Sequence, residues 1–317
     1  MRCVAAAFAL LAWVPVAQAA PVQIVVLETS PAAETLSAGA TAAGSTVARL
    51  PAGVSTWQQG APMAARLVFD TSAVALLGPF DGAGAHVAAM LATKRRVPLI
   101  ALSSEATFTR VFDPWIFRGV PDDEAQADAL LRWVFPGADG PRHHAARVVV
   151  PDGREGRERA DALTRACGRL GVSVSADAAA PVDTTLLWLD APEATAYMAE
   201  PRASGAPILG SLRLDDPAFL AHGDGVAMPL LGGGGAAAGE THPLAWRLGH
   251  DLARAAVESA RRDGPDPEKL RVRLSSGAAL GSDGPDGAGV FHFDTHGNRV
   301  GAIPVGVVRG GRLVPAR

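Results

Sequence analysis

Residues Val74–Arg118 have the sequence VALLGPFDGAGAHVAAMLATKRRVPLIALSSEATFTRVFDPWIFR. Two short apolar runs, Ala73–Leu77 and Val97–Leu102, flank a stretch in which Val87 and Met90 share one face at helical spacing. The pattern predicts a strand, a helix and a second strand. In such a unit the two strands run parallel and the helix covers one face of their sheet.

The same alternation continues on both sides of this stretch. Strands are predicted at 22–27, 147–150, 186–189, 226–231, 290–293, 302–308 and 312–314, and helices at 122–134, 163–170 and 243–264. A Pro- and Gly-containing loop at 136–141 interrupts the series. We therefore expect an α/β fold with two Rossmann-like lobes, parallel sheets and an interlobe cleft. Residues 29–60, rich in Ala, Ser, Thr and Gly, give no clear assignment.

The amino terminus has the pattern of a secretory leader. Arg2 precedes an apolar run from Val4 to Val16, and Ala17-Gln18-Ala19 is a small-x-small cleavage site. We predict that residues 1–19 are a signal peptide and that the mature protein is periplasmic. Cleavage leaves Cys167 as the only cysteine, which excludes an internal disulfide, and its helical spacing with Leu163 and Leu170 predicts a buried side chain.

Composition and motifs exclude several classes of function. The chain has 317 residues and a formal net charge of −3, so it has no basic excess with which to bind nucleic acid. Gly-x-Ser-x-Gly, His-Glu-x-x-His and phosphate-loop motifs are absent. The acidic run at 283–287 lacks the spacing of a calcium loop. We expect no enzyme activity, no cofactor and no metal.

The same residues resemble the type 1 periplasmic solute-binding proteins of the leucine/isoleucine/valine-binding kind. The resemblance rests on Gly78-Pro79, Val97-Pro98, Ser103-Ser104, and the Phe117-Arg118 crossing, with later matches at Asp152-Gly153, 249–251 and 289–298. It spans residues 62 to 317 in order. It implies a protein that closes two lobes over a small ligand and delivers it to an ABC permease. We expect a monomer.

The resemblance also implies how the lobes are divided. Lobe one is expected to comprise residues 20–118 and 241–290, and lobe two residues 119–240 and 291–317. The chain would then cross between the lobes three times, near Arg118, Glu240 and Val290.

The predicted ligand site lies in the loops that follow the strands. Ligands of open α/β sheets bind beyond the carboxyl ends of the strands, here after Leu77, Leu102 and Val150. The expected site residues are Asp81, Gly82, Ala83, Ser103, Ser104 and Glu105 from lobe one and Asp152, Arg154 and Asp190 from lobe two.

Two of these positions depart from the resembled family. Amino-acid binders of that family place hydroxyl residues where this chain has Asp81 and Glu105, so a ligand carboxylate there would meet like charge. The sequence therefore predicts a cationic or neutral polar ligand rather than a standard branched-chain amino acid. Asp81 as a plain helix cap and Glu105 as a solvated loop carboxylate stay open as alternatives.

Two other functions also stay open. One is a periplasmic sensory or accessory binding module that no longer transports its ligand. The other is an exported hydrolase, which would need a nucleophile, a base and an oxyanion site converging in the cleft.

Overall fold

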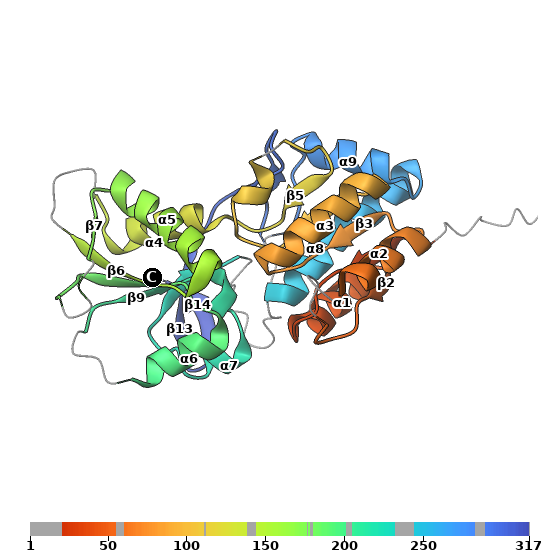
Figure 1. Cartoon of the computed structure of the whole chain (residues 1–317). Helices are drawn as coiled ribbons and strands as arrows, with labels where there is room; N and C mark the ends of the chain where they lie inside the picture. Colours follow the sequence, from red (N-terminus) through yellow and green to blue (C-terminus); the bar gives the residue numbers. More distant parts are fainter. Residues whose placement is uncertain are drawn as a thin grey trace, which may run out of the picture.

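The computed structural model describes residues 21–54, 60–110, 112–137, 144–175, 177, 180–200, 205–231, 244–282 and 289–316. Within them the chain forms two α/β lobes that lie side by side (Figure 1). The predicted fold class is confirmed. The predicted leader, the crossing near Glu240 and the acidic run at 283–287 lie outside the described residues.

The first lobe is built on a five-stranded parallel sheet in the order β2-β1-β3-β4-β5. Its strands are β1 (Gln23–Val26), β2 (Thr46–Arg49), β3 (Ala75–Leu77), β4 (Leu99–Ala101) and β5 (Ile116–Arg118). Its helices are α1 (Ala32–Ala42), α2 (Gly60–Asp70), α3 (Gly82–Arg95), α8 (Leu244–Asp263) and α9 (Pro267–Ser275), and a short 3-10 turn spans Thr107–Thr109. Residues 29–60, unassigned from sequence, thus contain α1 and β2.

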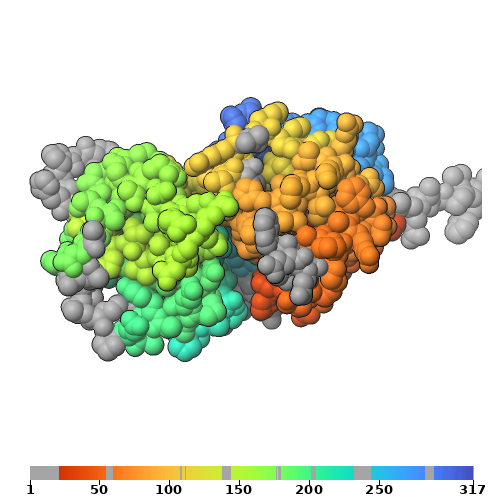
Figure 2. All heavy atoms as spheres, in the orientation of Figure 1, coloured from red at the N-terminus to blue at the C-terminus, as the bar shows by residue number. Residues whose placement is uncertain are grey.

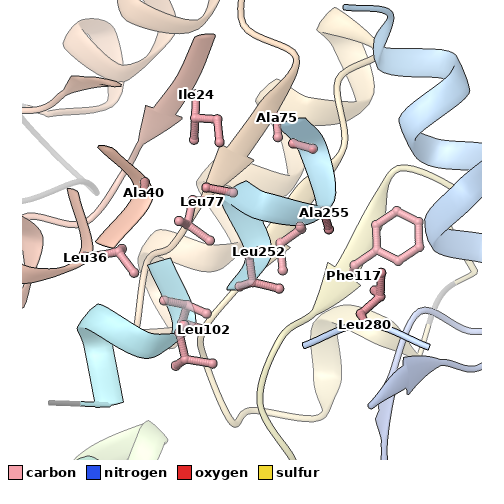
Figure 3. Close-up of a cluster of buried hydrophobic side chains, with 14 of the residues drawn as sticks. Ile24, Leu36, Ala40, Ala75, Leu77, Leu102, Phe117, Leu252, Ala255 and Leu280 are labelled. Atoms are coloured by element: carbon pink, nitrogen blue, oxygen red, sulfur yellow. The ribbon is translucent and has the colours of Figure 1, made fainter. Parts of the chain in front are cut away.

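Alternating side chains of this sheet pack into two separate hydrophobic cores. Ile24 and Val26 pack with α1 and α8 on one face, whereas Val25 and Leu27 pack with α2 and α3 on the other. Figure 3 shows the first of these cores, with Leu36 and Ala40 of α1 and Leu252 of α8 facing the strands. Both faces are apolar because helices cover both, as in other parallel sheets.

The second lobe is built on a seven-stranded sheet in the order β14-β13-β10-β9-β8-β6-β7. Its strands are β6 (Ala145–Val149), β7 (Ser173–Val174), β8 (Thr184–Leu187), β9 (Ile208–Gly210), β10 (Ala227–Pro229), β13 (Val305–Arg309) and β14 (Arg312–Pro315). Strands β13 and β14 run antiparallel and the rest of the sheet is parallel. Helices α4 (Asp123–Val134) and α5 (Gly153–Arg169) cover one face, and α6 (Ala191–Ala199) and α7 (Pro217–Leu220) the other, with a 3-10 turn at Leu212–Leu214.

Cys167 lies in the core between α5 and this sheet and is fully buried. Burial raises the pKa of its thiol to about 11, so it stays protonated and unreactive at neutral pH. The predicted buried cysteine is confirmed.

Two of the segments that join the lobes are tied together. Arg118 donates to Asp122 Oδ2 at 3.0 Å and to Asn298 Oδ1 at 2.7 Å, and Arg299 donates to the Gly119 carbonyl at 3.1 Å. These bonds join the end of β5 to the hairpin of β11 (His292–Phe293) and β12 (Arg299–Val300). Arg118 and Asn298 also form a parallel bridge, so the two segments lie side by side between the lobes.

The hairpin differs from its predicted placement. Phe293 packs on Phe117 of β5 with ring centroids 5.1 Å apart, and both belong to the first lobe's core. The predicted boundary at 290 assigned this hairpin to lobe two, whereas only the later strands β13 and β14 join the second sheet. The alternating apolar pattern of 290–293 identifies a strand but does not say which core it enters.

Candidate functional site

A cavity of about 600 Å³ lies between the two lobes. Figure 2 shows the two lobes from outside, meeting where the green surface of lobe two adjoins the orange surface of lobe one. The cavity's described lining comes from both lobes and comprises Glu28–Ala32, Gly53, Val54, Phe80, Asp81, Leu102, Ser104, Val120, Gln126, Asp190–Pro192, Leu212, Arg213, Asp215, Asp216, Leu244 and Ala245.

The topology explains why these residues meet. Residues 28–32 follow β1, residues 80–81 follow β3 and residues 102–104 follow β4, so all three loops emerge at the carboxyl edge of the first sheet. Residues 190–192 follow β8 and residues 212–216 follow β9 at the corresponding edge of the second sheet. The two edges face one another across the cavity, as the rule for open α/β sheets predicts.

Glu28 is the most deeply buried carboxylate of the cavity's lobe-one wall. It is 3% exposed, and its Oε1 accepts from the Thr29 and Ser30 amides at 2.8 and 2.7 Å. Its Oε2 accepts from the Phe80 amide at 2.7 Å. The side chain thus joins the loops after β1 and β3. Glu28 was not among the site residues predicted from the sequence, although it follows the first predicted strand directly.

Asp81 both caps a helix and lines the cavity. Its Oδ1 accepts from the Gly84 amide at 2.6 Å at the start of α3. Although Asp81 is exposed, partial desolvation raises the pKa of its carboxyl, and the charge of Glu28 raises it further, against the lowering effect of the Gly84 bond. The capping alternative for Asp81 is therefore confirmed, and it does not exclude the predicted cleft position.

Glu105 lines a smaller neighbouring cavity of about 200 Å³, whereas Asp81 lines the large one. Its carboxylate is bonded to Thr107 and, at 3.2 Å, to His86 of α3. Burial alone raises the pKa of Glu105, but these two hydrogen bonds leave it below its ordinary value. The predicted pairing of Asp81 and Glu105 on one wall is not observed.

Of the other predicted lobe-one residues, Ser104 is in the described lining of the cavities and three are not. Ser104 is buried and lines both of them, whereas Ser103, fully buried, accepts from the Glu105 amide at 3.3 Å. Gly82 lies against the Glu105 carboxylate with no room for a β-carbon, and Ala83 is exposed. Gly82, Ala83 and Ser103 are not in the described lining of either cavity.

Of the three predicted lobe-two residues, one lines a cavity and two do not. Asp190 lines the large cavity and is held by Arg159 at 3.3 Å and by Arg213 at 3.7 Å. Asp152 and Arg154 begin α5 and are exposed, and Arg154 pairs with Glu158 at 2.8 Å. Neither is in the described lining of a cavity, whereas Glu155 of the same turn lines the smaller one.

Arg213 connects the two cavities. It lines both, and its guanidinium lies 3.4 Å from Glu155 and 3.7 Å from Asp190. Deeper on the same side, Asp215 pairs with the buried Arg247 at 3.4 Å. Burial raises the pKa of Asp215 despite this guanidinium.

Comparison with protein families identifies the chain. A family model described as periplasmic binding protein matches residues 51–220, more than half of the sequence. The chain belongs to the periplasmic binding protein family. The resemblance drawn from the sequence is thereby confirmed, and the members of this family are solute-binding proteins rather than enzymes.

Solved structures of the family share the fold at low sequence identity. A substrate-binding protein from Desulfitobacterium hafniense in complex with Leu has a TM-score of 0.74 and 14% identity, over 94% of this chain and 100% of that one. LivJ from Streptococcus pneumoniae with isoleucine has 0.72 and 14%, over 93% and 98%. A solute-binding protein from R. palustris with benzoate has 0.72 and 15%, over 93% and 95%. No curated protein sequence matches the chain.

Two features of other protein classes are absent from the described part of the chain. None of its helices is both long and apolar enough to cross a membrane. No group of three or more His, Cys, Asp or Glu side chains in it is placed to hold a metal ion.

Proposed function

We propose that the protein is exported to the periplasm, captures a small solute between its lobes and delivers it to an ABC permease. The observation that carries the proposal is the interlobe cavity of about 600 Å³. Its volume lies within the range of small-molecule sites, and its lining combines apolar side chains with a few polar groups, as such sites do. Family membership supports the same function.

The chemistry of the lining supports capture over catalysis. The described residues that line the cavity include neither His, Lys nor Cys, which are frequent general bases and nucleophiles. The linked crossing segments at Arg118 and Asn298 support a hinge about which the lobes close. A hinged binding site needs affinity that differs between open and closed states, and no reacting group.

The proposal predicts ligand-dependent stability. In a thermal-shift screen of residues 20–317 against a broad metabolite library, at least one solute should raise the Tm. A ligand at about 100 times its Kd adds roughly 2.7 kcal/mol, which for a chain of this size is roughly 5–10 °C. An unrelated protein screened in parallel removes compounds that act on the dye. A library with no stabilising solute would contradict solute capture.

A further inference from the structure

On the lobe-one wall of the large cavity, several amide donors that an anionic ligand could use are already taken by the protein's own carboxylates. Backbone N–H groups at strand ends and helix amino termini are the usual anchors for a ligand carboxylate. Here the Thr29, Ser30 and Phe80 amides donate to Glu28, and the Gly84 amide at the start of α3 donates to Asp81. The lobe-one wall therefore presents carboxylate oxygens to a ligand where free donors would otherwise be.

The positive charges of the cavity are paired with carboxylates other than Glu28 and Asp81, although the charge of Arg213 also acts to lower the pKa of Asp81. Arg213 is the one cationic side chain in the described lining, and it contacts Glu155 and Asp190. Arg247, behind the lining, pairs with Asp215. Among the described residues neither Glu28 nor Asp81 has an ion-pair partner, and Asp81 Oδ2 accepts no hydrogen bond. The carboxylates of the described lining without an ion pair are therefore Glu28 and Asp81 on lobe one and Asp216 on lobe two.

A second polar group is left for a ligand in the same place. Ser104 is 4% exposed and lines the cavity, and its Oγ makes no hydrogen bond of good geometry with the described residues, although a weak interaction with it lowers the pKa of Asp123. A buried hydroxyl without a partner costs stability unless something else satisfies it. This hydroxyl is available to a ligand beside the carboxylate wall.

Several apolar side chains also line the cavity. Phe80 and Leu102 from lobe one, Val120 from the crossing segment, and Leu212 and Leu244 surround the same space. A hydrocarbon body in contact with these side chains would leave water, at about 25 cal/mol per Å² of apolar surface buried. The cavity thus combines a negatively charged lobe-one wall with a group of apolar side chains.

We propose that the cleft selects a small organic cation: a protonated amine on an apolar body, without a free carboxylate. The ammonium lies at Asp81, with Glu28 behind it and the Ser104 hydroxyl beside it. The apolar part packs on Phe80, Leu102 and Leu212. This ligand class rests on the proposed function. The positive ligand charge agrees with the expectation from the sequence. The second carboxylate near the ligand is Glu28, however, and not Glu105 as expected.

Matched amine and acid pairs test this ligand class by calorimetry. Isoamylamine and isocaproate share one apolar body, and phenethylamine and hydrocinnamate share another, so only the charged group differs within a pair. At least one amine should bind saturably, and its acid partner should bind at least about tenfold more weakly. Raising the salt from about 50 to about 300 mM should weaken the amine, because the contact is between partly exposed charges.

Asp81→Asn isolates the charge. Asparagine caps helices as well as aspartate does, so the variant keeps the α3 cap and loses only the negative charge. The amine should then bind about tenfold or more weakly. The control is Asp266→Asn, which makes the same change at the cap of α9, outside both cavities, and should bind like the unmodified protein.

Three outcomes overturn the ligand class: an acid that binds as well as its amine, an amine affinity that is insensitive to Asp81→Asn, or no saturable binding of either amine. Binding of an acid in the cleft would still support solute capture. Solute capture itself fails only with the library screen.

Discussion

Gly39→Ala and Gly249→Ala should each lower the Tm by several degrees. The two glycines lie where α1 and α8 cross, and a β-carbon on either would overlap a backbone carbonyl of the other helix, that of Trp246 for Gly39 and that of Leu36 for Gly249. A carbonyl cannot rotate away as a flexible side chain can, so the helices must separate. Overpacking of this kind costs about 1–3 kcal/mol, or roughly 2–12 °C here.

The matched control is Gly168→Ala in α5. Gly168 is an exposed helical glycine with open space around it, so alanine should be neutral or stabilising by up to about 1 kcal/mol. Thermal unfolding of the three variants compares the same substitution with and without room for it. Equal Tm values for Gly39→Ala and Gly168→Ala would show that α1 and α8 are not in close contact. Separation of α1 and α8 would also move Ala32 and Leu244, which line the large cavity.

Arg247→Met should destabilise the protein by about 3–5 kcal/mol. The guanidinium is 7% exposed, donates to the Leu231 carbonyl at 3.0 and 3.2 Å, and lies 3.4 Å from Asp215. Its removal leaves a buried carboxylate without its guanidinium partner, which costs far more than the net gain of the intact pair. Arg154→Met, at an exposed pair with Glu158, should change the Tm little.

The loss at Arg247 should depend on pH. Burial already raises the pKa of Asp215, and removal of the guanidinium raises it further. A carboxyl whose pKa is higher in the folded state binds its proton more tightly there, so the penalty decreases as pH falls through that raised pKa. The Tm difference from the unmodified protein should therefore narrow between pH 7 and pH 5. A difference that stays constant or widens would contradict this account of Asp215.

A double variant tests whether Arg247 and Asp215 stabilise the protein as a pair. Replacement of a buried ion pair by apolar side chains of similar size is often close to neutral. Arg247→Met combined with Asp215→Leu should therefore recover much of the stability that Arg247→Met loses. Losses that simply add would show that the two side chains act independently.

The sequence predicted those elements of the fold whose apolar residues are large. Strands β1, β3 and β4 alternate between two cores and were predicted within a few residues. Helix α1 was not predicted, because its buried face is Ala33, Leu36, Gly39 and Ala40, and small residues give little hydrophobic periodicity. The close contact with α8 that requires Gly39 is thus also the reason why the helix is hard to detect. Strands β5 and β9 lie in apolar runs of only two or three residues, 115–117 and 208–209, whereas β3 and β4 lie in the longer runs 73–77 and 97–102.

A site residue could be predicted from the sequence where the strand that precedes it could be predicted. Asp81, Ser104 and Asp190 were expected at strand ends and do line the large cavity. Glu28 obeys the same rule after β1 and was overlooked. Arg213 and Asp215 follow β9, which was not predicted, so no rule could place them. Glu105 turns toward His86 and Thr107, and that contact depends on how α3 packs on the loop after β4.

The central claim is that the solute lies between the lobes, and a pair of tryptophan variants on α1 tests it most directly. Ala32 lines the large cavity, whereas Ala38 is exposed on the same helix. For the most stabilising solute of the library, calorimetry should show that Ala32→Trp abolishes binding because the indole fills the cavity. Ala38→Trp should bind with the Kd of the unmodified protein. Retention of binding by Ala32→Trp at an unchanged Kd would place the solute elsewhere and contradict the account.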